Sequence, residues 1–376
     1  MSSLFKVPLT TIREIQAHPN ADKLEIAVVY GFSVIVKKEA YKVGDEVIYI
    51  PIDSILPQKL EDHIFPPGSK IVLDKHRVRQ IRIRKTPSQG MLINPNDIKT
   101  VFGFTPNVLE QDYADILGVK KYTPPEQKGP AGKPGGRKAK EDENPLFHKY
   151  NGLDNIKWYP EKFKNDEMVV IQEKIHGMNA RAALMPYVAN TFWKKVKKFL
   201  KLTPEYEFCY GSNNVQIQAK RNYTGYYGED IHGKVFKNLG VDMLLRKGET
   251  IYGEIYGDGI QKNYSYGCQP GEHKFVLFDV KILQEDGSQR WLNPDEVEAY
   301  AKERGFQTVP TLYRGMFNLD IAKQLTIGDS VLAPTQKVRE GVVVKSLDKY
   351  DEFGNKRALK VISEVYLDDS SNTDFQ

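Results

Sequence analysis

One lysine of the sequence stands where it could act as a covalent nucleophile. Lys174 follows the apolar run 168–171, which we predict to be a buried strand, and it precedes a histidine-glycine pair. Gly177 would let the backbone turn sharply beside the lysine. An amine attacks phosphorus only when neutral, so its pKa must be lowered by burial, a nearby cation or a metal ion. The alternative is a surface lysine next to a turn.

Two further strands carry side chains that suit a nucleotide. Glu254 lies between glycines in the predicted strand 251–257, and burying a lone carboxylate there is costly unless it has a function. The predicted strand 274–280 carries two aromatic residues and one aspartate. We assign Phe275 to the core, whereas Phe278 could belong either to the core or to a surface that stacks on a base.

Two more lysines lie in apolar runs near the end of the sequence. Lys345 belongs to the predicted strand 339–346, and Lys360 belongs to the predicted strand 357–363. A lysine is expensive to bury unless it meets an anion, so both could converge with Lys174 on one phosphate. The alternative is that each lysine reaches solvent at the end of its strand.

The composition is that of an ordinary globular protein. Its 376 residues suggest two or three domains, with 40% hydrophobic and 27% charged residues. We find no run long enough to span a membrane and no signal peptide, and therefore expect a cytoplasmic or nuclear protein without a membrane partner. Cys209 and Cys268 are expected to be reduced. The net charge of +5 mildly favours an anionic partner.

The first 110 residues contain closely spaced strand signals at 11–15, 24–29, 32–36 and 46–50, which predict a small β-barrel. Residues 18–24 resemble the loop of the OB-type tRNA-binding domains of some aminoacyl-tRNA synthetases, although they could form a simple turn. Residues 75–85 alternate basic and apolar side chains. On a strand, their basic face would suit a phosphate backbone, or it would simply be solvated.

Two segments interrupt this pattern of strands. Residues 122–144 mix proline, glycine, lysine and arginine, so we predict a flexible basic linker without a fold of its own. Residues 192–201 predict a short basic amphipathic helix. We expect Phe192, Val196 and Phe199 to pack inward, with the lysines outside, rather than to serve a membrane role.

The order of these features resembles the covalent nucleotidyltransferases, which are the polynucleotide ligases and capping enzymes. The resemblance covers roughly residues 145–367. It rests on five stretches in the family's order: 174–177 with the nucleophile, 251–257 with Gly-Glu, 275–280 with Phe-Asp, 340–345 with Glu-Gly-x-x-x-Lys, and 359–363 with the last lysine. Five motifs in order make the resemblance specific, where each alone is not.

Two details point to the ATP-dependent RNA ligases within this superfamily. DNA ligases and capping enzymes usually have aspartate at the position of His176, whereas histidine followed by Asn179 resembles RNA ligases. The predicted barrel also precedes the catalytic domain instead of following it. One departure concerns the last motif, which often carries two lysines two residues apart. Ile362 stands at the second position here, and Lys356 or Arg357 could compensate.

The resemblance implies an α+β fold. An N-terminal OB-like β-barrel would be followed by a nucleotidyltransferase domain of antiparallel sheets with flanking helices. We place the OB-like nucleic-acid-binding domain at 1–120, the linker at 121–144 and the adenylyltransferase domain at 145–376. The implied enzyme is a monomeric ligase that joins RNA 3′-hydroxyl and 5′-phosphate ends, including nicks in RNA/DNA hybrids, in RNA repair.

The implied mechanism uses ATP and Mg²⁺, or Mn²⁺, and forms a lysyl-AMP intermediate on Lys174. Fixed cations would meet the charge on the phosphates. The expected ATP-binding residues are Glu173, Lys174, Asn179, Glu254, Phe278, Lys345 and Lys360. Glu340 is the first expected metal ligand and Glu254 the second. Expected nucleic-acid contacts are His176, Arg181 and Arg221.

Two other functions remain open at this point. The same chemistry would serve a DNA ligase or a GTP-using capping enzyme, against which His176 and the N-terminal barrel argue. A non-catalytic RNA-binding protein with a decayed transferase domain is the alternative from another class. The complete set of lysines and glutamates in the five motifs argues against such decay.

Overall fold

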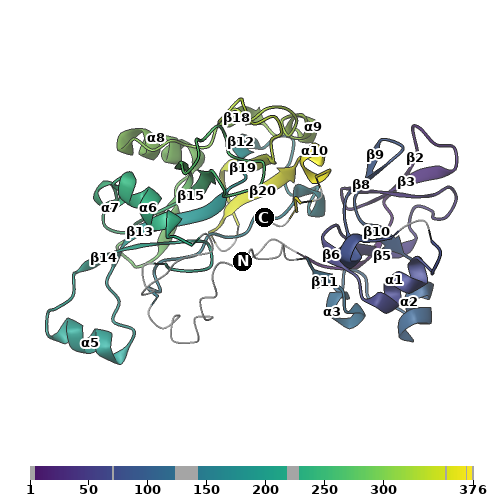
Figure 1. Cartoon of the computed structure of the whole chain (residues 1–376), viewed down its shortest axis with the longest axis horizontal. Helices are drawn as coiled ribbons and strands as arrows, with labels where there is room; N and C mark the ends of the chain where they lie inside the picture. The colour runs from purple at the N-terminus through teal and green to yellow at the C-terminus, as the bar shows by residue number, and fades with distance from the viewer. Residues whose placement is uncertain are drawn as a thin grey trace. The chain divides into compact units, whose positions relative to one another are not determined.

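The computed structural model describes residues 5–69, 72–122, 143–217, 228–351, 354–369 and 371–374. The chain forms two compact units, and Figure 1 labels many of their helices and strands. We call residues 2–124, 153–164 and 360–376 the barrel unit. Residues 125–152 and 165–359 form the two-sheet unit. The predicted linker lies almost entirely outside the described residues.

The barrel unit consists of short antiparallel sheets with the strand orders β1-β5-β10, β2-β3-β4 and β11-β6-β7, together with the pair β8-β9. Its strands are β1 (Leu9–Thr11), β2 (Glu14–Ala17), β3 (Leu24–Val29), β4 (Phe32–Lys37), β5 (Glu46–Ile50), β6 (Ser54–Ile55), β7 (Arg77–Val78), β8 (Ile81–Ile83), β9 (Thr86–Ser88), β10 (Met91–Ile93) and β11 (Lys120–Lys121). Its helices are α1 (Gln58–Ile64), α2 (Pro95–Phe102), α3 (Ala114–Leu117), α10 (Glu364–Leu367) and the 3-10 turns η1 (Asp74–His76) and η2 (Ile156–Trp158).

The basic stretch 75–85 is not the continuous strand that its alternation predicts. Lys75 and His76 adopt positive φ angles of 53° and 60°, as do Arg84 and Lys85 at 50° and 72°. Left-handed backbone cannot continue a β-ladder, so the stretch is divided into η1, β7 and the short hairpin strand β8. Its basic side chains therefore do not form one regular row.

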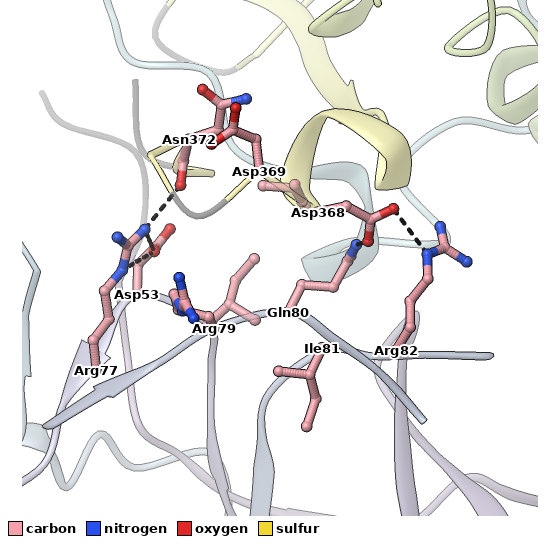
Figure 2. A pocket seen from close by; sticks show the side chains of 11 residues that line it. Asp53, Arg77, Arg79, Gln80, Ile81, Arg82, Asp368, Asp369 and Asn372 are labelled. Atoms are coloured by element: carbon pink, nitrogen blue, oxygen red, sulfur yellow. Dashed lines mark hydrogen bonds and ion pairs between the residues drawn. The ribbon is translucent and has the colours of Figure 1, made fainter. Parts of the chain in front are cut away.

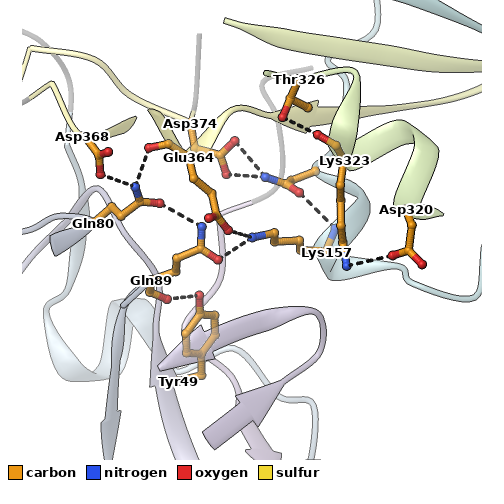
Figure 3. Close-up of polar contacts among 11 residues, drawn as sticks. Tyr49, Gln80, Gln89, Lys157, Asp320, Lys323, Thr326, Glu364, Asp368 and Asp374 are labelled. Atoms are coloured by element: carbon orange, nitrogen blue, oxygen red, sulfur yellow. Dashed lines mark hydrogen bonds and ion pairs between the residues drawn. The ribbon is translucent and has the colours of Figure 1, made fainter. Parts of the chain in front are cut away.

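Two segments distant in sequence complete the barrel unit. Trp158 packs its ring against Tyr30, Phe32 and Tyr49, at centroid distances of 4.9, 5.1 and 5.6 Å. Lys157 donates to Gln89 Oε1 at 2.5 Å, in the polar network that Figure 3 shows. The sequence-based boundaries place residues 153–164 and 360–376 in the predicted adenylyltransferase domain. In the structure, the backbone contacts of both segments group them with the barrel unit.

The last residues of the chain also border a cavity of about 390 Å³ in the barrel unit. Figure 2 shows two ion pairs in its wall, Arg77 with Asp53 and Arg82 with Asp368, in which the closest atoms are 2.5 and 2.8 Å apart. Two arginines of the predicted phosphate-binding stretch are thus already paired with carboxylates of the chain itself.

The two-sheet unit contains a four-stranded sheet, β18-β12-β19-β20, and a five-stranded sheet, β14-β13-β15-β16-β17. The strands are β12 (Met168–Lys174), β13 (Met178–Pro186), β14 (Tyr206–Gly211), β15 (Glu249–Gly257), β16 (His273–Leu283), β17 (Gln289–Trp291), β18 (Thr311–Met316), β19 (Gly341–Tyr350) and β20 (Lys356–Ile362). The helices are α5 (Phe192–Phe199), α6 (Ile231–Asn238), α7 (Val241–Leu244), α8 (Pro294–Arg304) and α9 (Leu319–Gln324). The division between the two units falls inside β20.

Helices α6, α7 and α8 pack on the five-stranded sheet and bury the main core of this unit. Phe236 from α6 meets Phe275 from β16 with ring centroids 5.4 Å apart, which confirms the assignment of Phe275 to the core. Helix α8 begins with a capping box, in which Asn293 and Glu296 satisfy each other's backbone N–H groups. These helices fix the sheet that carries Glu254.

The pairing of β12 with β19 sets the direction of the two predicted lysines. Lys174 lies opposite Gly341, and Val170 lies opposite Lys345. Opposite residues of an antiparallel pair share a face, and so do residues separated by an even number of positions. Lys174 and Lys345 therefore project from the same face of the four-stranded sheet.

Three other expectations can be compared with the structure. Cys209 and Cys268 do not form a disulfide with each other, as expected. Among the described residues, no helix is long and apolar enough to cross a membrane. The inward packing expected for the helix at 192–201 is wrong, because Phe192 and Phe199 are 72% and 86% exposed on α5. The sequence therefore predicts the helix but not the exposure of its apolar side chains.

Candidate active site

The predicted nucleophile ends β12 and meets a buried carboxylate. Lys174 Nζ lies 2.5 Å from Glu340 Oε1, and the side chain of Glu340 is only 1% exposed. Glu340 directly precedes Gly341, the first residue of β19, and the β12–β19 register thereby brings the two groups together. A charge-assisted contact of this kind holds the ammonium in place. If Lys174 is the predicted nucleophile, its amine would have to lose a proton and leave this carboxylate.

The turn after the nucleophile is held by groups from another loop. The backbone N–H of His176 donates to the Tyr266 hydroxyl at 2.7 Å, and Gln261 Nε2 donates to the carbonyl of Gly177 at 2.7 Å. A Cβ at Gly177 would lie 2.3 Å from the carbonyl oxygen of Ile255. Glycine is required here because the turn approaches β15 more closely than any side chain allows.

His176 itself lies inside the site and not on its surface. Its ring is 4% exposed, with Nδ1 3.9 Å from Glu340 Oε2 and its centroid 4.6 Å from that of Tyr264. Burial, assisted by the charge of Lys174, lowers the pKa of His176 to about 3. The imidazole is therefore neutral near pH 7 and adds no positive charge beside the nucleophile.

Glu254 and Asn179 face each other across the pair β13–β15. Burial raises the pKa of Glu254 to about 8, with Glu340 adding to the increase and Lys174 opposing it. Most of this carboxyl is therefore protonated at pH 7, which lets it donate a hydrogen bond as well as accept one. Asn179 Oδ1 is buried without a hydrogen-bond partner among the described residues. Both groups suit hydroxyls of a ribose.

A second cluster surrounds Asp279, which is completely buried on β16. Lys345 Nζ lies 3.2 Å from Asp279 Oδ2, and Lys356 Nζ contacts the other oxygen. Tyr150 Oη donates to the same carboxylate at 2.6 Å. Lys345 also donates to the carbonyl of Phe278 at 2.7 Å. Two cations and one anion therefore share a largely buried site next to Phe278.

The charges of this cluster are strongly shifted by their surroundings. The pKa of Lys345 is lowered to about 8, chiefly by burial and also by Lys356, while Asp279 opposes both effects. Burial favours a neutral Asp279, but the two lysines outweigh it and hold the pKa of this carboxyl below its usual value. Lys345 therefore remains mostly charged at pH 7 because it has its carboxylate partner.

Two predicted site residues have internal partners instead. Glu173 Oε2 accepts from the backbone N–H groups of Val331 and Leu332, at 2.8 and 3.2 Å, and thereby fixes that loop. The buried Arg181 donates to the carbonyls of Ser212 and Phe147, at 2.9 and 2.5 Å. The burial of Arg181 argues against its predicted contact with nucleic acid.

The remaining predicted residues are Phe278, Lys360 and Arg221. Phe278 is partly exposed and meets Tyr150 edge-on, with centroids 4.9 Å apart. Lys360 is buried in the part of β20 that groups with the barrel unit, where its Nζ contacts the carbonyl oxygen of Asp374 and lies 3.5 Å from Asp374 Oδ1. Arg221 lies outside the described residues.

The carboxylates of the site suit a divalent cation that is also bound by water and substrate phosphates. Among the described residues, no three His, Cys, Asp or Glu side chains cluster into a metal cage. Mg²⁺ typically uses one or two carboxylates together with water and substrate phosphates. Glu340 provides one carboxylate of this kind. Glu254, whose pKa Glu340 helps to raise, would provide a second when it is ionised.

Comparison with known proteins identifies the group to which the chain belongs. A family model described as RNA ligase matches residues 167–362, which is more than half of the 376 residues. The chain belongs to the RNA ligase family. A model described as an OB-fold domain matches residues 7–95 of this ligase and confirms the predicted N-terminal barrel. A search of curated protein sequences found no match.

Solved structures with the same fold come from Naegleria gruberi. Its RNA ligase with PPi is 21% identical to this ligase, with a TM-score of 0.72, and the match covers 98% of this chain and 100% of the other. A mutant of that enzyme with ATP and Mn is 20% identical, with a TM-score of 0.71 and coverage of 96% and 97%. These matches confirm the predicted α+β fold class.

Sequence reasoning missed the groups that position the catalytic turn of the ligase. Tyr266 and Gln261 lie between β15 and β16, in a tyrosine- and glycine-rich loop that resembles no motif. Tyr150 was not recognised as a partner of Asp279, because 129 residues separate the two. The only available signal was the unusual number of tyrosines near predicted motif strands.

Proposed function

We propose that this RNA ligase uses ATP and forms a lysyl-AMP intermediate on Lys174. The observation that carries the proposal is the contact between Lys174 and Glu340, on the same sheet face from which Lys345 projects. A nucleophile, a carboxylate and a buried cation thus occupy one region of the two-sheet unit. The titles of similar Naegleria gruberi structures name ATP or AMP with Mn, which is consistent with this choice of nucleotide.

In the first step, Lys174 Nζ would form a bond to the α-phosphorus while the bond to the pyrophosphate oxygen breaks. The ammonium of Lys174 must first lose a proton, for which the carboxylate of Glu340 is the nearest acceptor. Lys345 would stabilise the charge on the α-phosphate oxygens. Glu254 and Asn179 would hold the ribose hydroxyls, and Phe278 would stack on the adenine.

A divalent cation, Mg²⁺ or Mn²⁺, would be held by Glu340 directly or through water, with Glu254 as the second carboxylate. When bound, it would neutralise charge on the phosphates. Lys360, in the last motif, is proposed as a further phosphate contact. The last motif has Ile362 where a second lysine is common. Lys356 is a better candidate than Arg357 to replace that lysine, because Lys356 and Lys345 both contact Asp279.

In the later steps, AMP would pass from Lys174 to an RNA 5′-phosphate, and a 3′-hydroxyl would then displace it. We further propose that the enzyme acts as a monomer in RNA repair and accepts nicks in RNA/DNA hybrids. Residues 1–120 would hold the nucleic acid, residues 121–144 would tether the two domains, and residues 145–376 would catalyse the reaction. Arg221 is kept as a proposed RNA contact.

A labelling experiment tests the central step. The purified protein is incubated with Mg²⁺ and either α-labelled ATP or α-labelled GTP, and then separated by denaturing electrophoresis. We expect ATP alone to label the wild type and the Lys302→Ala control, in which an exposed lysine is lost. Lys174→Ala should abolish the label without unfolding the protein. Labelling of the folded Lys174→Ala variant would refute the proposed nucleophile.

The substrate is tested with matched nicked duplexes in which each strand at the nick is either RNA or DNA. Sealing that requires RNA on the 3′-hydroxyl side supports the proposed RNA ligase and its use of hybrid nicks. Sealing of an all-DNA nick at the same rate would contradict the proposed preference for RNA.

A further inference from the structure

Helix α5 is an exposed appendage of the two-sheet unit. It lies in the connection between β13 and β14, and Figure 1 shows it well away from the sheets of this unit. None of its residues is buried, and Trp193 and Phe199 are 72% and 86% exposed. Large apolar side chains that lie together on a surface commonly mark a binding site.

The same helix and the residues directly after it carry a dense positive charge. Five lysines lie between positions 194 and 201, and no acidic residue occurs from 187 to 204. Among the described residues, no carboxylate forms an ion pair with Lys195, Lys197, Lys198 or Lys201. Four exposed lysines without carboxylate partners are suited to a polyanion.

Lysines and aromatic rings alternate along both edges of the helix. Trp193 and Lys197 are four residues apart, and so are Lys195 and Phe199, so that each pair lies side by side on the helix surface. Nucleic-acid grooves that accept single strands combine cations for the backbone with rings on which bases stack. Each edge of α5 provides both groups within one turn.

The strands that carry α5 fix its distance from the nucleophile. β13 begins at Met178, four residues after Lys174, and extends to Pro186, which pairs with Tyr206 of β14. Its eight residue steps span about 26 Å at roughly 3.3 Å per step. At about 3.4 Å per nucleotide of a stacked strand, this distance corresponds to roughly eight nucleotides.

We propose that α5 is an auxiliary RNA-binding element, which grips a single-stranded part of the RNA about eight nucleotides or more from the ends being joined. The identity of the bound strand rests on the proposed ligase function. RNA accounts for both the lysines and the rings, because the backbone meets the cations while bases cover the aromatic surface. An anionic lipid surface or a second copy of the chain are the other occupants that the experiment must distinguish.

The test compares three variants with the wild type. The lysine variant carries Lys195→Ser, Lys197→Ser, Lys198→Ser and Lys201→Ser, and the ring variant carries Phe192→Ser, Trp193→Ser and Phe199→Ser. The control variant removes four exposed lysines elsewhere, at Lys164, Lys237, Lys302 and Lys323. All of the changed side chains are exposed, so unchanged thermal melting is expected for all three variants.

Binding is measured with a fluorescent single-stranded RNA of about 20 nucleotides, at salt concentrations from about 50 to 200 mM. Loss of four phosphate contacts should reduce the slope of log affinity against log salt by up to about 3 in the lysine variant. The ring variant should bind at least about fivefold more weakly for each stacked base that is lost. The control variant should behave like the wild type.

Catalysis separates this proposal from the proposed function. The lysine and ring variants should form lysyl-AMP normally and seal ends with flanks of about four nucleotides normally, but seal flanks longer than about ten nucleotides more slowly. Normal sealing of both lengths, with unchanged salt dependence, would overturn the role of α5. Failure of the wild type itself to form lysyl-AMP would instead refute the proposed function.

Two further measurements distinguish the other occupants. Co-sedimentation with vesicles of phosphatidylserine and phosphatidylcholine that is lost only in the lysine or ring variant, with unchanged RNA binding, would assign α5 to a lipid surface. A concentration-dependent dimer of the wild type that is lost only in the ring variant, again with unchanged RNA binding, would assign it to a second copy. Either result would overturn the proposal.

Discussion

Replacing Asp279 by asparagine tests how the buried lysines of the site are kept charged. Asparagine has nearly the same shape but cannot neutralise Lys345 and Lys356, which both contact this fully buried carboxylate. The variant therefore leaves the buried Lys345 and the mostly buried Lys356 without a carboxylate partner. Two effects should follow, one on the stability of the protein and one on the pH range of lysyl-AMP formation.

The stability effect follows from the loss of one partner of a buried charge pair, which typically costs about 3 to 5 kcal/mol. A domain of this size loses about 2 to 4 °C of Tm per kcal/mol, so Asp279→Asn should melt about 6 to 20 °C below the wild type. Tyr150→Phe is the matched control. It removes only one hydrogen bond to the carboxylate and should cost about 1.5 to 3 kcal/mol.

The effect on pH dependence has a definite sign. The pKa of Lys345 is about 8 in the folded protein, below the ordinary lysine value, so its charge is present below pH 8 and is lost above it. Between these two pKa values the unfolded state binds more protons than the folded state. The contribution of Lys345 to the free energy of unfolding therefore increases as the pH rises through that range, which stabilises the folded protein. Without Asp279, the pKa of Lys345 falls further.

The assay is single-turnover formation of lysyl-AMP from about pH 6 to about pH 9. We expect the alkaline limb of the wild type to fall near pH 8 and that of Asp279→Asn to move to lower pH. Tyr150→Phe should keep the alkaline limb of the wild type, because both lysines retain their partner. An alkaline limb that does not move in Asp279→Asn, together with an unchanged Tm, would refute the assigned electrostatic role.

Three other predictions concern the same unit. Lys356→Met should slow lysyl-AMP formation by about tenfold or more at neutral pH and shift its alkaline limb upward, because Lys356 lowers the pKa of Lys345; an unchanged rate would make Lys356 purely structural. Gly177→Ala should impair labelling by about tenfold or more, since its Cβ would lie 2.3 Å from the Ile255 carbonyl oxygen, and wild-type labelling would show that the turn can move. Tyr266→Phe should lower the free energy of unfolding by about 1 to 3 kcal/mol, measured by denaturant titration, because a buried N–H loses its acceptor; stability equal to that of the wild type would imply another acceptor.

The strands that carry the motifs could be predicted because their signals are local. Apolar runs gave β12, β15 and β19 to within a few residues, and Lys174, Glu254 and Lys345 could be placed on them from sequence alone. The antiparallel register that places two of these residues on one sheet face required the structure. Motif order could suggest that they share a site, but not which atoms meet.

The sequence could not show contacts between side chains and partners that are distant along the chain. The guanidinium of Arg181 donates to the carbonyls of Phe147 and Ser212, 34 and 31 residues away, which no local pattern indicates. The pattern of lysines and aromatic residues predicts the helix α5, but it does not indicate whether the aromatic side chains are buried or exposed. Alternation at 75–85 predicted a strand, although positive φ angles interrupt it.

The discontinuity of the barrel unit has a consequence for dissecting this ligase. Trp158 fills a slot between Tyr30, Phe32 and Tyr49, although more than a hundred residues separate it from them. A fragment that ends at residue 120 would be made with that slot empty. Removing the first 120 residues would expose the Trp158 ring to solvent. A loss of activity in either fragment would therefore report on folding as well as on RNA binding. Point substitutions are the cleaner tool for separating the two.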